Sequence, residues 1–308
     1  MSAPSSAIPN PDAAAFDEAT TRMRSVVMCV DDFGLKPEVN EAVVELADAG
    51  VVSATGCMSL GPAWREGAAL LRGAPLDVGL HFNLTESFAA NGGSGSSAAD
   101  WLLPQPLWRV MLMAHRRALP EQALQRALQL QLDTFEDAWG GPPDFVDGHQ
   151  HVHQLPQVRE RLLAELERRY GPASSARRPW LRLTRAPRQG AVSFKQRIIE
   201  SLGAREFERL ARERGFRLNG ALLGVYGFDE DAAGYERRLA AWLAQAQEGD
   251  VLMMHPAKPT AGSASTGEAI AAARETEYAV LSACGREHLT LAGVRAGRMA
   301  ADSSILRR

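Results

Sequence analysis

Short apolar runs alternate with longer segments of helical periodicity along most of this chain. The runs are continuously apolar, a pattern typical of strands buried on both faces of a parallel sheet. About seven such strands are expected. The candidate runs cover residues 25–30, 51–58, 77–80, 180–184, 220–224 (the weakest), 250–254 and 288–291, together with the run that ends at His149.

The segments between these runs have the length and apolar spacing of helices. The first shows both end signals, with Pro37 at its start and Gly50 just past its end. Helices are expected over residues 37–49, 64–71, 107–117, 120–139, 156–169, 193–214 and 231–247, and in a last segment that ends at Ala283. The alternation predicts parallel βαβ units in an α/β fold, a single TIM-barrel-like domain of about seven mainly parallel strands.

We expect the domain to span residues 25–295, between a disordered arm (1–24, rich in Ala, Ser and Pro) and a C-terminal tail (296–308). The arm lacks the basic start and apolar core of a secretory signal. No segment approaches the roughly 20 apolar residues that cross a bilayer. The expectation is a cytoplasmic protein without a membrane span.

The amino-acid composition limits the binding partners and the cysteine chemistry to be expected. The 308 residues are 45% hydrophobic and 23% charged, and the net charge of −3 gives no reason to expect nucleic acid or an anionic membrane as partner. The three cysteines, Cys29, Cys57 and Cys284, include no Cys-x-x-Cys pair. Neither a disulfide framework nor a thiolate zinc site is therefore expected.

Polar side chains gather where the predicted strands end. Asp31 and Asp32 follow the first strand, His81 follows the third, and His255 follows the strand 250–254. The middle strand leads into three histidines on alternate residues, His149, His151 and His153. Because the carboxyl ends of parallel strands meet on one face of the fold, these groups can converge there.

Imidazoles and a carboxylate, with positions left open for water, are the ligands of a catalytic divalent-metal site. Zinc is favoured, and magnesium or manganese remain alternatives. Neighbouring side chains of an extended segment point opposite ways, so Asp31 and Asp32 are expected to differ in role, one binding the metal and one acting as a base. The alternatives are a helix-capping pair for these two residues, a core histidine for His81, and a turn cap for Asp147.

Four motifs in order carry a family resemblance. They are Val30-Asp31-Asp32-Phe33-Gly34, Gly79-Leu80-His81-Phe82-Asn83-Leu84-Thr85, Val146-Asp147-Gly148-His149-Gln150-His151-Val152-His153 and Met254-His255-Pro256. With them the chain resembles the YdjC/ChbG-like carbohydrate deacetylases, a family that includes the hopanoid-biosynthesis deacetylases of the HpnK type. The similarity runs from about residue 26 to about residue 291.

The resemblance implies a metal-dependent hydrolase that removes N-acetyl groups from an amino sugar or oligosaccharide, on a distorted β/α barrel. Carried over by position, Asp32, His81 and His149 would hold the metal, Asp31 would be the base and His255 the acid. Supporting or substrate-contacting roles would fall to Asp147, His151, His153 and Asn83. A homodimer is one expected assembly.

Some features depart from the family. Cys29-Val30 replaces the Asn-Ala that often precedes the Asp pair, and the Gly/Ser-rich segment 87–99 has no match, so it is either a substrate lid or an unstructured insertion. Two other functions are also considered: a metal-dependent amide hydrolase of the amidohydrolase type, and a sugar- or metal-binding homologue without catalysis.

Overall fold

A ten-residue strand, β1 (Arg24–Phe33), lies in the middle of the sheet, and all of it except its first residue is buried. It pairs in parallel with β2 (Ala54–Cys57) along one edge and with β7 (Val251–Met254) along the other. The computed structural model describes residues 23–88, 105–172, 178–190, 192–260 and 270–301.

The remaining strands extend this sheet into a barrel. They are β3 (Asp77–Phe82), β4 (Phe145–Gly148), β5 (Trp180–Leu181), β6 (Leu222–Leu223) and β8 (Val294–Ala296). The order is β5-β4-β3-β2-β1-β7-β6, with β8 paired to the start of β1, and every strand pair is parallel. An isolated parallel bridge joins Leu181 of β5 to Leu218, four residues before β6 begins. The predicted α/β barrel of parallel strands is confirmed.

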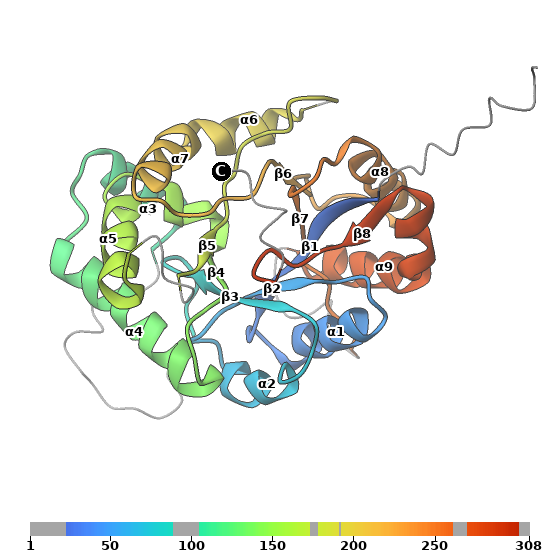
Figure 1. Cartoon of the computed structure of the whole chain (residues 1–308), viewed down its shortest axis with the longest axis horizontal. Helices are drawn as coiled ribbons and strands as arrows, with labels where there is room; N and C mark the ends of the chain where they lie inside the picture. The colour runs from blue at the N-terminus through green and yellow to red at the C-terminus, as the bar shows by residue number, and fades with distance from the viewer. Residues whose placement is uncertain (1–22, 89–104, 173–177, 191, 261–269, 302–308) are drawn as a thin grey trace, which may run out of the picture.

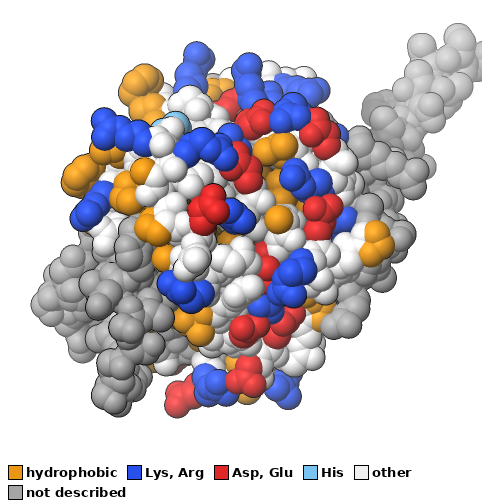
Figure 2. Space-filling view, turned by 90° about the vertical axis from the view of Figure 1, so that its left-hand side faces the viewer, with side chains coloured by type: hydrophobic (Ala, Val, Ile, Leu, Met, Phe, Trp, Pro, Cys, Tyr) orange, Lys and Arg blue, Asp and Glu red, His pale blue; other side chains and the backbone are white. Residues whose placement is uncertain are grey.

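Helices surround the strands on the outside (Figure 1). They are α1 (Pro37–Asp48), α2 (Trp64–Leu70), α3 (Leu107–His115), α4 (Glu121–Trp139), α5 (Val158–Tyr170), α6 (Phe194–Ser201), α7 (Ala204–Glu213), α8 (Ala232–Gln245) and α9 (Ala271–Leu291). A 3₁₀ helix, η3 (His149–Gln154), follows β4 directly. The face formed by α4 and α5 carries acidic and basic side chains side by side (Figure 2), including the ion pair of Arg169 with Glu136 at 3.0 Å.

The alternation of side chains along the strands separates two apolar regions. Val26, Met28 and Val30 pack outward among the helices. Val27 and Cys29 instead belong to a smaller cluster inside the barrel. That cluster also contains inward-facing residues of the other strands and three residues outside the strands: Ala54, Phe145, Trp180, Leu222, Val251 and Met253, with Ile199, Val225 and Met299. One sheet face thus packs on helices and the other fills the barrel.

The predicted strand 288–291 is wrong. These residues form the last turn of α9, where Leu289 is buried and Leu291 is 85% exposed, and the final strand is β8 instead. Only Leu289 of these four residues is buried, which is typical of one face of a helix and not of a buried strand. The predicted helix 193–214 is two helices, α6 and α7, because the chain turns at Gly203, whose φ is 139°.

Several predictions fall on residues outside the described ranges, namely the arm up to residue 22, segment 87–99 from residue 89 on, and the tail beyond residue 301. Within the described part the chain still packs after β8: Met299 is fully buried, and the backbone N–H of Ala300 donates to Asp77. No helix in the described ranges combines the length and the apolar character that crossing a membrane requires.

Candidate metal centre

The barrel interior becomes charged at the carboxyl ends of the strands. Asp31 lies two positions beyond Cys29 on β1. His81 is the penultimate residue of β3, two positions beyond Gly79, and Asp147 is two positions beyond Phe145 on β4. Since alternate residues share a face, these side chains point inward. His81 and Asp147 are register partners, and all three side chains are buried.

Asp32 departs from this alternation. Its φ is 68°, and the register between β1 and β2 shifts between Val30 and Phe33. Such irregularities re-aim a side chain. As a result, His81 Nε2 lies 3.4 Å from Asp32 Oδ1 and 4.0 Å from Asp31 Oδ2. The expectation that the two aspartates point to opposite sides is wrong, because both reach the same imidazole.

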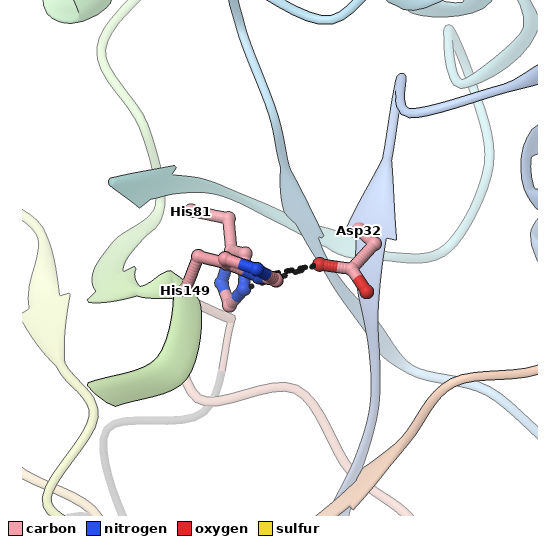
Figure 3. Close-up of side chains that lie close together, drawn as sticks. All are labelled: Asp32, His81 and His149. Carbon is pink, nitrogen blue, oxygen red and sulfur yellow. Dashed lines mark hydrogen bonds and ion pairs between the residues drawn. The ribbon is translucent and has the colours of Figure 1, made fainter. Parts of the chain in front are cut away.

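His149 completes the group from the first position of η3. Its Nδ1 lies 3.0 Å from Asp32 Oδ1, and its ring centroid is 5.5 Å from that of His81. Figure 3 shows both imidazoles directed at the Asp32 carboxylate. One ligand atom of each of these three residues lies within 4.8 Å of the other two. The structure thus brings together the three residues predicted to bind a metal.

The surroundings of this cluster fit a divalent cation. Asp147 Oδ1 accepts a hydrogen bond from His81 Nδ1 at 2.7 Å, which leaves His81 Nε2 directed at Asp32. A carboxylate behind a ligating imidazole is typical of metal sites. His149 Nε2 makes no hydrogen bond to the described residues and faces Glu86 Oε1 at 3.5 Å. An imidazole left incompletely satisfied beside a carboxylate suits a metal ligand.

A second group of three, Asp31, His81 and Asp147, is equally close-packed. The buried Arg182 guanidinium already pairs with both of its carboxylates. One Arg182 nitrogen donates to Asp31 Oδ2 at 2.7 Å, and another lies 3.2 Å from the Cys29 sulfur. A cation bound there would have to compete with Arg182 for both carboxylates. Asp32, His81 and His149 are therefore the better candidate ligands.

The pKa values of Asp32, His149 and His81 show that this cluster favours positive charge beside the Asp32 carboxylate. Burial disfavours the Asp32 carboxylate, but the Arg274 guanidinium and then His149 hold the pKa of Asp32 well below its usual range. Burial also opposes a charge on His149, yet the carboxylates of Asp32 and Glu86 raise its pKa to about 9. The carboxylates around His81 likewise outweigh its burial and raise its pKa. A bound cation would replace the protons on the imidazoles.

His255 follows β7 at the same end of the barrel. Its Nε2 lies 4.0 Å from Asp31 Oδ2, and the Phe228 ring packs edge-on against it with centroids 5.1 Å apart. Burial lowers the pKa of His255 to about 4, against the opposite effect of the aspartates. Asp31 Oδ2 therefore lies 4.0 Å from the Nε2 atoms of two imidazoles, those of His81 and His255.

The other candidate residues have different surroundings. The buried His153 donates its Nε2–H to the Arg182 carbonyl at 2.9 Å, and Asn83 Oδ1 accepts backbone N–H groups of Thr85 and Glu86 at 2.9 and 2.8 Å. These contacts stabilise the segments that carry the site. His151 is half-buried with φ 61°, and its Nδ1 has no hydrogen-bond partner among the described residues.

Three charged residues of the site escaped the sequence analysis: Arg182, Arg274 and Glu277. All three are at most 2% exposed. Arg182 follows β5, and the other two lie three positions apart on α9. The sequence did contain a signal for Arg182, which stands within the apolar run Trp180-Leu181-Arg182-Leu183. A charged side chain in a buried strand needs an oppositely charged partner, so this arginine pointed to a buried carboxylate.

Parallel strands curled into a barrel, with a carboxylate and two imidazoles converging at their carboxyl ends, define a β/α-barrel protein with a candidate divalent-metal site at its mouth. The chain belongs to the YdjC-like protein family, whose model matches residues 25–284. The resemblance inferred from the four motifs is thereby confirmed.

Curated relatives match over part of their length. The chain is 35% identical over 179 residues to the carbohydrate deacetylase of Mus musculus, covering 56% of this chain and 54% of that protein. It is 34% identical over 168 residues to the chitooligosaccharide deacetylase of Enterobacter sp. (strain 638), covering 53% of this chain and 65% of that one. The matched region thus spans from about half to just under two thirds of these relatives.

Similarity of fold extends further than similarity of sequence. A solved structure from Enterococcus faecalis V583, provisionally described as a cellobiose-phosphate cleavage protein, superposes with a TM-score of 0.66. The match covers 92% of this chain and 100% of that one, at 17% identity. At this identity the likeness shows the fold alone.

Proposed function

We propose that this protein is a metal-dependent hydrolase that removes the N-acetyl group from an amino sugar or an oligosaccharide. The observation that carries the proposal is the convergence of Asp32, His81 and His149 beside the carboxylate of Asp31. Membership of the YdjC-like family and the similarity to relatives named carbohydrate and chitooligosaccharide deacetylases supply the substrate class.

Asp32, His81 and His149 would hold one divalent cation, for which two imidazoles and a carboxylate favour zinc over magnesium or manganese. The cation supplies Lewis-acid chemistry, which makes a water more acidic and an acetyl carbonyl more electrophilic. Asp147 keeps His81 in the required tautomer through the hydrogen bond at Nδ1.

Asp31 is the proposed base. Its carboxylate is fixed by Arg182, and its Oδ2 lies 4.0 Å from His81 Nε2, next to the candidate metal position. A general base must be held within reach of the proton that it removes. Asp31 therefore accepts the proton of the attacking water as the carbon–oxygen bond to the acetyl carbon forms.

His255 is the proposed acid. An amide nitrogen leaves poorly unless it is protonated, so a proton donor is needed on the leaving-group side. With a pKa of about 4, His255 is neutral at rest, and once protonated it readily gives up its proton. Asp31 Oδ2, only 4.0 Å from His255 Nε2, is a nearby source of that proton within the reaction cycle.

The test is release of acetate from acetylated chitooligosaccharides, with and without a chelator. The proposal predicts release that stops on chelation and returns when Zn²⁺ or Mn²⁺ is added. Asp31→Asn should bind metal as the wild type does and lose at least about 100-fold in kcat, because the base is removed while the ligands stay. Undiminished turnover in this variant would remove Asp31 from the base role.

A panel of cyclic amides tests the substrate class. Hydrolysis of those compounds, with acetylated sugars left intact, would replace deacetylation by an amidohydrolase-type activity. Metal and sugar binding without any hydrolysis would indicate a binding protein instead.

A further inference from the structure

The backbone of His255 is held by side chains of α9. Its N–H donates to Glu277 Oε2 at 2.5 Å, and its carbonyl oxygen accepts from Arg274 Nη1 at 3.2 Å. His255 stands just after the last residue of β7, so the strand pairing ends before it. The position of this imidazole therefore depends on a helix that follows it in the chain.

The same guanidinium also reaches the candidate metal ligand. Arg274 Nη2 lies 2.6 Å from Asp32 Oδ2, while the other carboxylate oxygen of Asp32 faces His81 and His149. One planar group thus spans from the backbone of His255 to the side chain of Asp32. Its two nitrogens fix the separation between the proposed acid and the candidate metal position.

Both side chains are buried, which is unusual for charges on a surface helix. Arg274 is 2% exposed and Glu277 is fully buried, and their spacing of three residues places them on one face of α9. Glu277 also accepts a hydrogen bond from the Tyr226 hydroxyl at 2.7 Å. Burying a charge costs free energy that only good partners offset. The partners here are parts of the site.

We propose that Arg274 and Glu277 are positioning residues that hold His255 in register with Asp32, so that α9 determines how far the proton donor stands from the metal. This role rests on the proposed deacetylase activity. It comprises two separable contributions from Arg274. First, the two nitrogens of the guanidinium bind the His255 carbonyl and Asp32 at the same time, which positions His255. Second, the positive charge beside Asp32 weakens the attraction of a metal cation to that carboxylate.

Two substitutions separate these contributions. Arg274→Lys keeps the positive charge, but its single amine cannot bind the His255 carbonyl and the Asp32 carboxylate with the same geometry. Arg274→Met removes both the charge and the hydrogen-bond donors. We expect kcat for acetate release to fall about 100-fold in each, the size of effect that a displacement of about 1 Å produces. Zn²⁺ affinity, measured by chelator competition, should stay within about twofold in Arg274→Lys and tighten about tenfold in Arg274→Met.

Glu277 and an exposed arginine provide matched variants. Glu277→Gln retains an acceptor for the His255 N–H and should keep most of kcat, while Glu277→Leu should not. Arg286→Lys changes an exposed arginine on the same helix and should leave every readout at the wild-type value. The imidazole ¹⁵N resonance of His255, read in histidine-labelled protein, should shift in Arg274→Lys and not in Arg286→Lys.

A wild-type kcat and an unshifted His255 resonance in Arg274→Lys would overturn the proposal. So would a parallel loss of kcat and Zn²⁺ affinity in both Arg274 variants, since that result indicates general structural damage. If Arg274→Met does not fold, Arg274→Lys decides alone. If the wild type releases no acetate, the proposed function fails, and the resonance and Zn²⁺ affinity still decide whether Arg274 positions His255.

Discussion

The two ends of the barrel interior both contain buried carboxylates, but the chain satisfies Asp77 at one end more fully than it satisfies the imidazoles at the other. At the amino ends of the strands, Asp77 Oδ1 accepts from Arg298 Nε at 3.0 Å. Asp77 Oδ2 accepts from the Ala300 N–H at 2.8 Å and from Trp180 Nε1 at 3.3 Å. Both carboxylate oxygens of Asp77 therefore have partners from the chain itself.

The carboxyl ends differ. One ring nitrogen each of His149, His151 and His255 is buried without a hydrogen bond to any described residue. The other ring nitrogens of His149 and His255 lie 3.0 Å from Asp32 and 4.0 Å from Asp31. Buried polar atoms normally have partners, so such a gathering needs an explanation. Buried charge alone therefore does not identify a site. A candidate site is identified instead by imidazole nitrogens that could bind a ligand and have no hydrogen-bond partner among the described residues.

The largest effect is expected at the carboxyl end. Asp32→Asn removes the negative charge of the candidate metal ligand and should lower kcat/KM for acetate release by about 1,000-fold or more, because Lewis-acid assistance contributes several kcal/mol. Its bound Zn²⁺, measured by elemental analysis after gel filtration, should fall well below one ion per chain. Wild-type metal content would remove Asp32 from the ligand set.

At the amino end a comparable substitution should act on stability alone. Asp77→Ala removes a buried carboxylate that pairs with the partly exposed Arg298 and with the buried Trp180 ring N–H. It should lower the free energy of unfolding, measured in urea, by about 2 to 3 kcal/mol. Asp77→Asn, which keeps the acceptor oxygen, should cost less. Both variants should keep the wild-type kcat and Zn²⁺ affinity once folded. A selective loss of metal from either one would contradict the separation of the two ends.

The smallest effect is a pH dependence of the metal-free protein. The pKa of His149 is raised to about 9 in the folded state, so its charged form stabilises the fold fully below the unfolded pKa of about 6.5. This stabilisation, at most about 3 kcal/mol, is lost as the pH rises through 9. Urea unfolding between pH 7 and 9 should show the decline in wild type.

His149→Gln supplies the control for that slope, since it cannot take up the proton. Saturating Zn²⁺ should flatten the slope as well, because the cation takes the place of the proton. An equal decline in His149→Gln would assign the effect to other groups.

The polar residues that end the strands were predictable because strand direction brings sequence-distant side chains to one face. Asp32, His81 and His149 follow from that rule. The positive φ of Asp32 does not follow, since a register shift depends on how β1 and β2 pair. A sequence shows strand ends more readily than irregular pairing.

The counter-charges were harder to predict. Arg274 and Glu277 lie in a helix whose sequence is also compatible with an ordinary polar surface. Asp32, the partner of Arg274, precedes it by more than 200 positions, and His255, the partner of Glu277, precedes it by 22. Only the packed barrel brings them inside. The error at residues 288–291 has a related origin, because Leu289 and Leu291 fit a short strand as well as a helix until neighbouring elements decide.

Anomalous diffraction from crystals soaked in Zn²⁺ tests the central claim most directly. The account predicts one strong peak within bonding distance of Asp32, His81 and His149, with Arg182 still paired to Asp31 and Asp147. A peak coordinated by Asp31 and Asp147 in place of the guanidinium, or no ordered ion at the barrel mouth at saturating Zn²⁺, would contradict it.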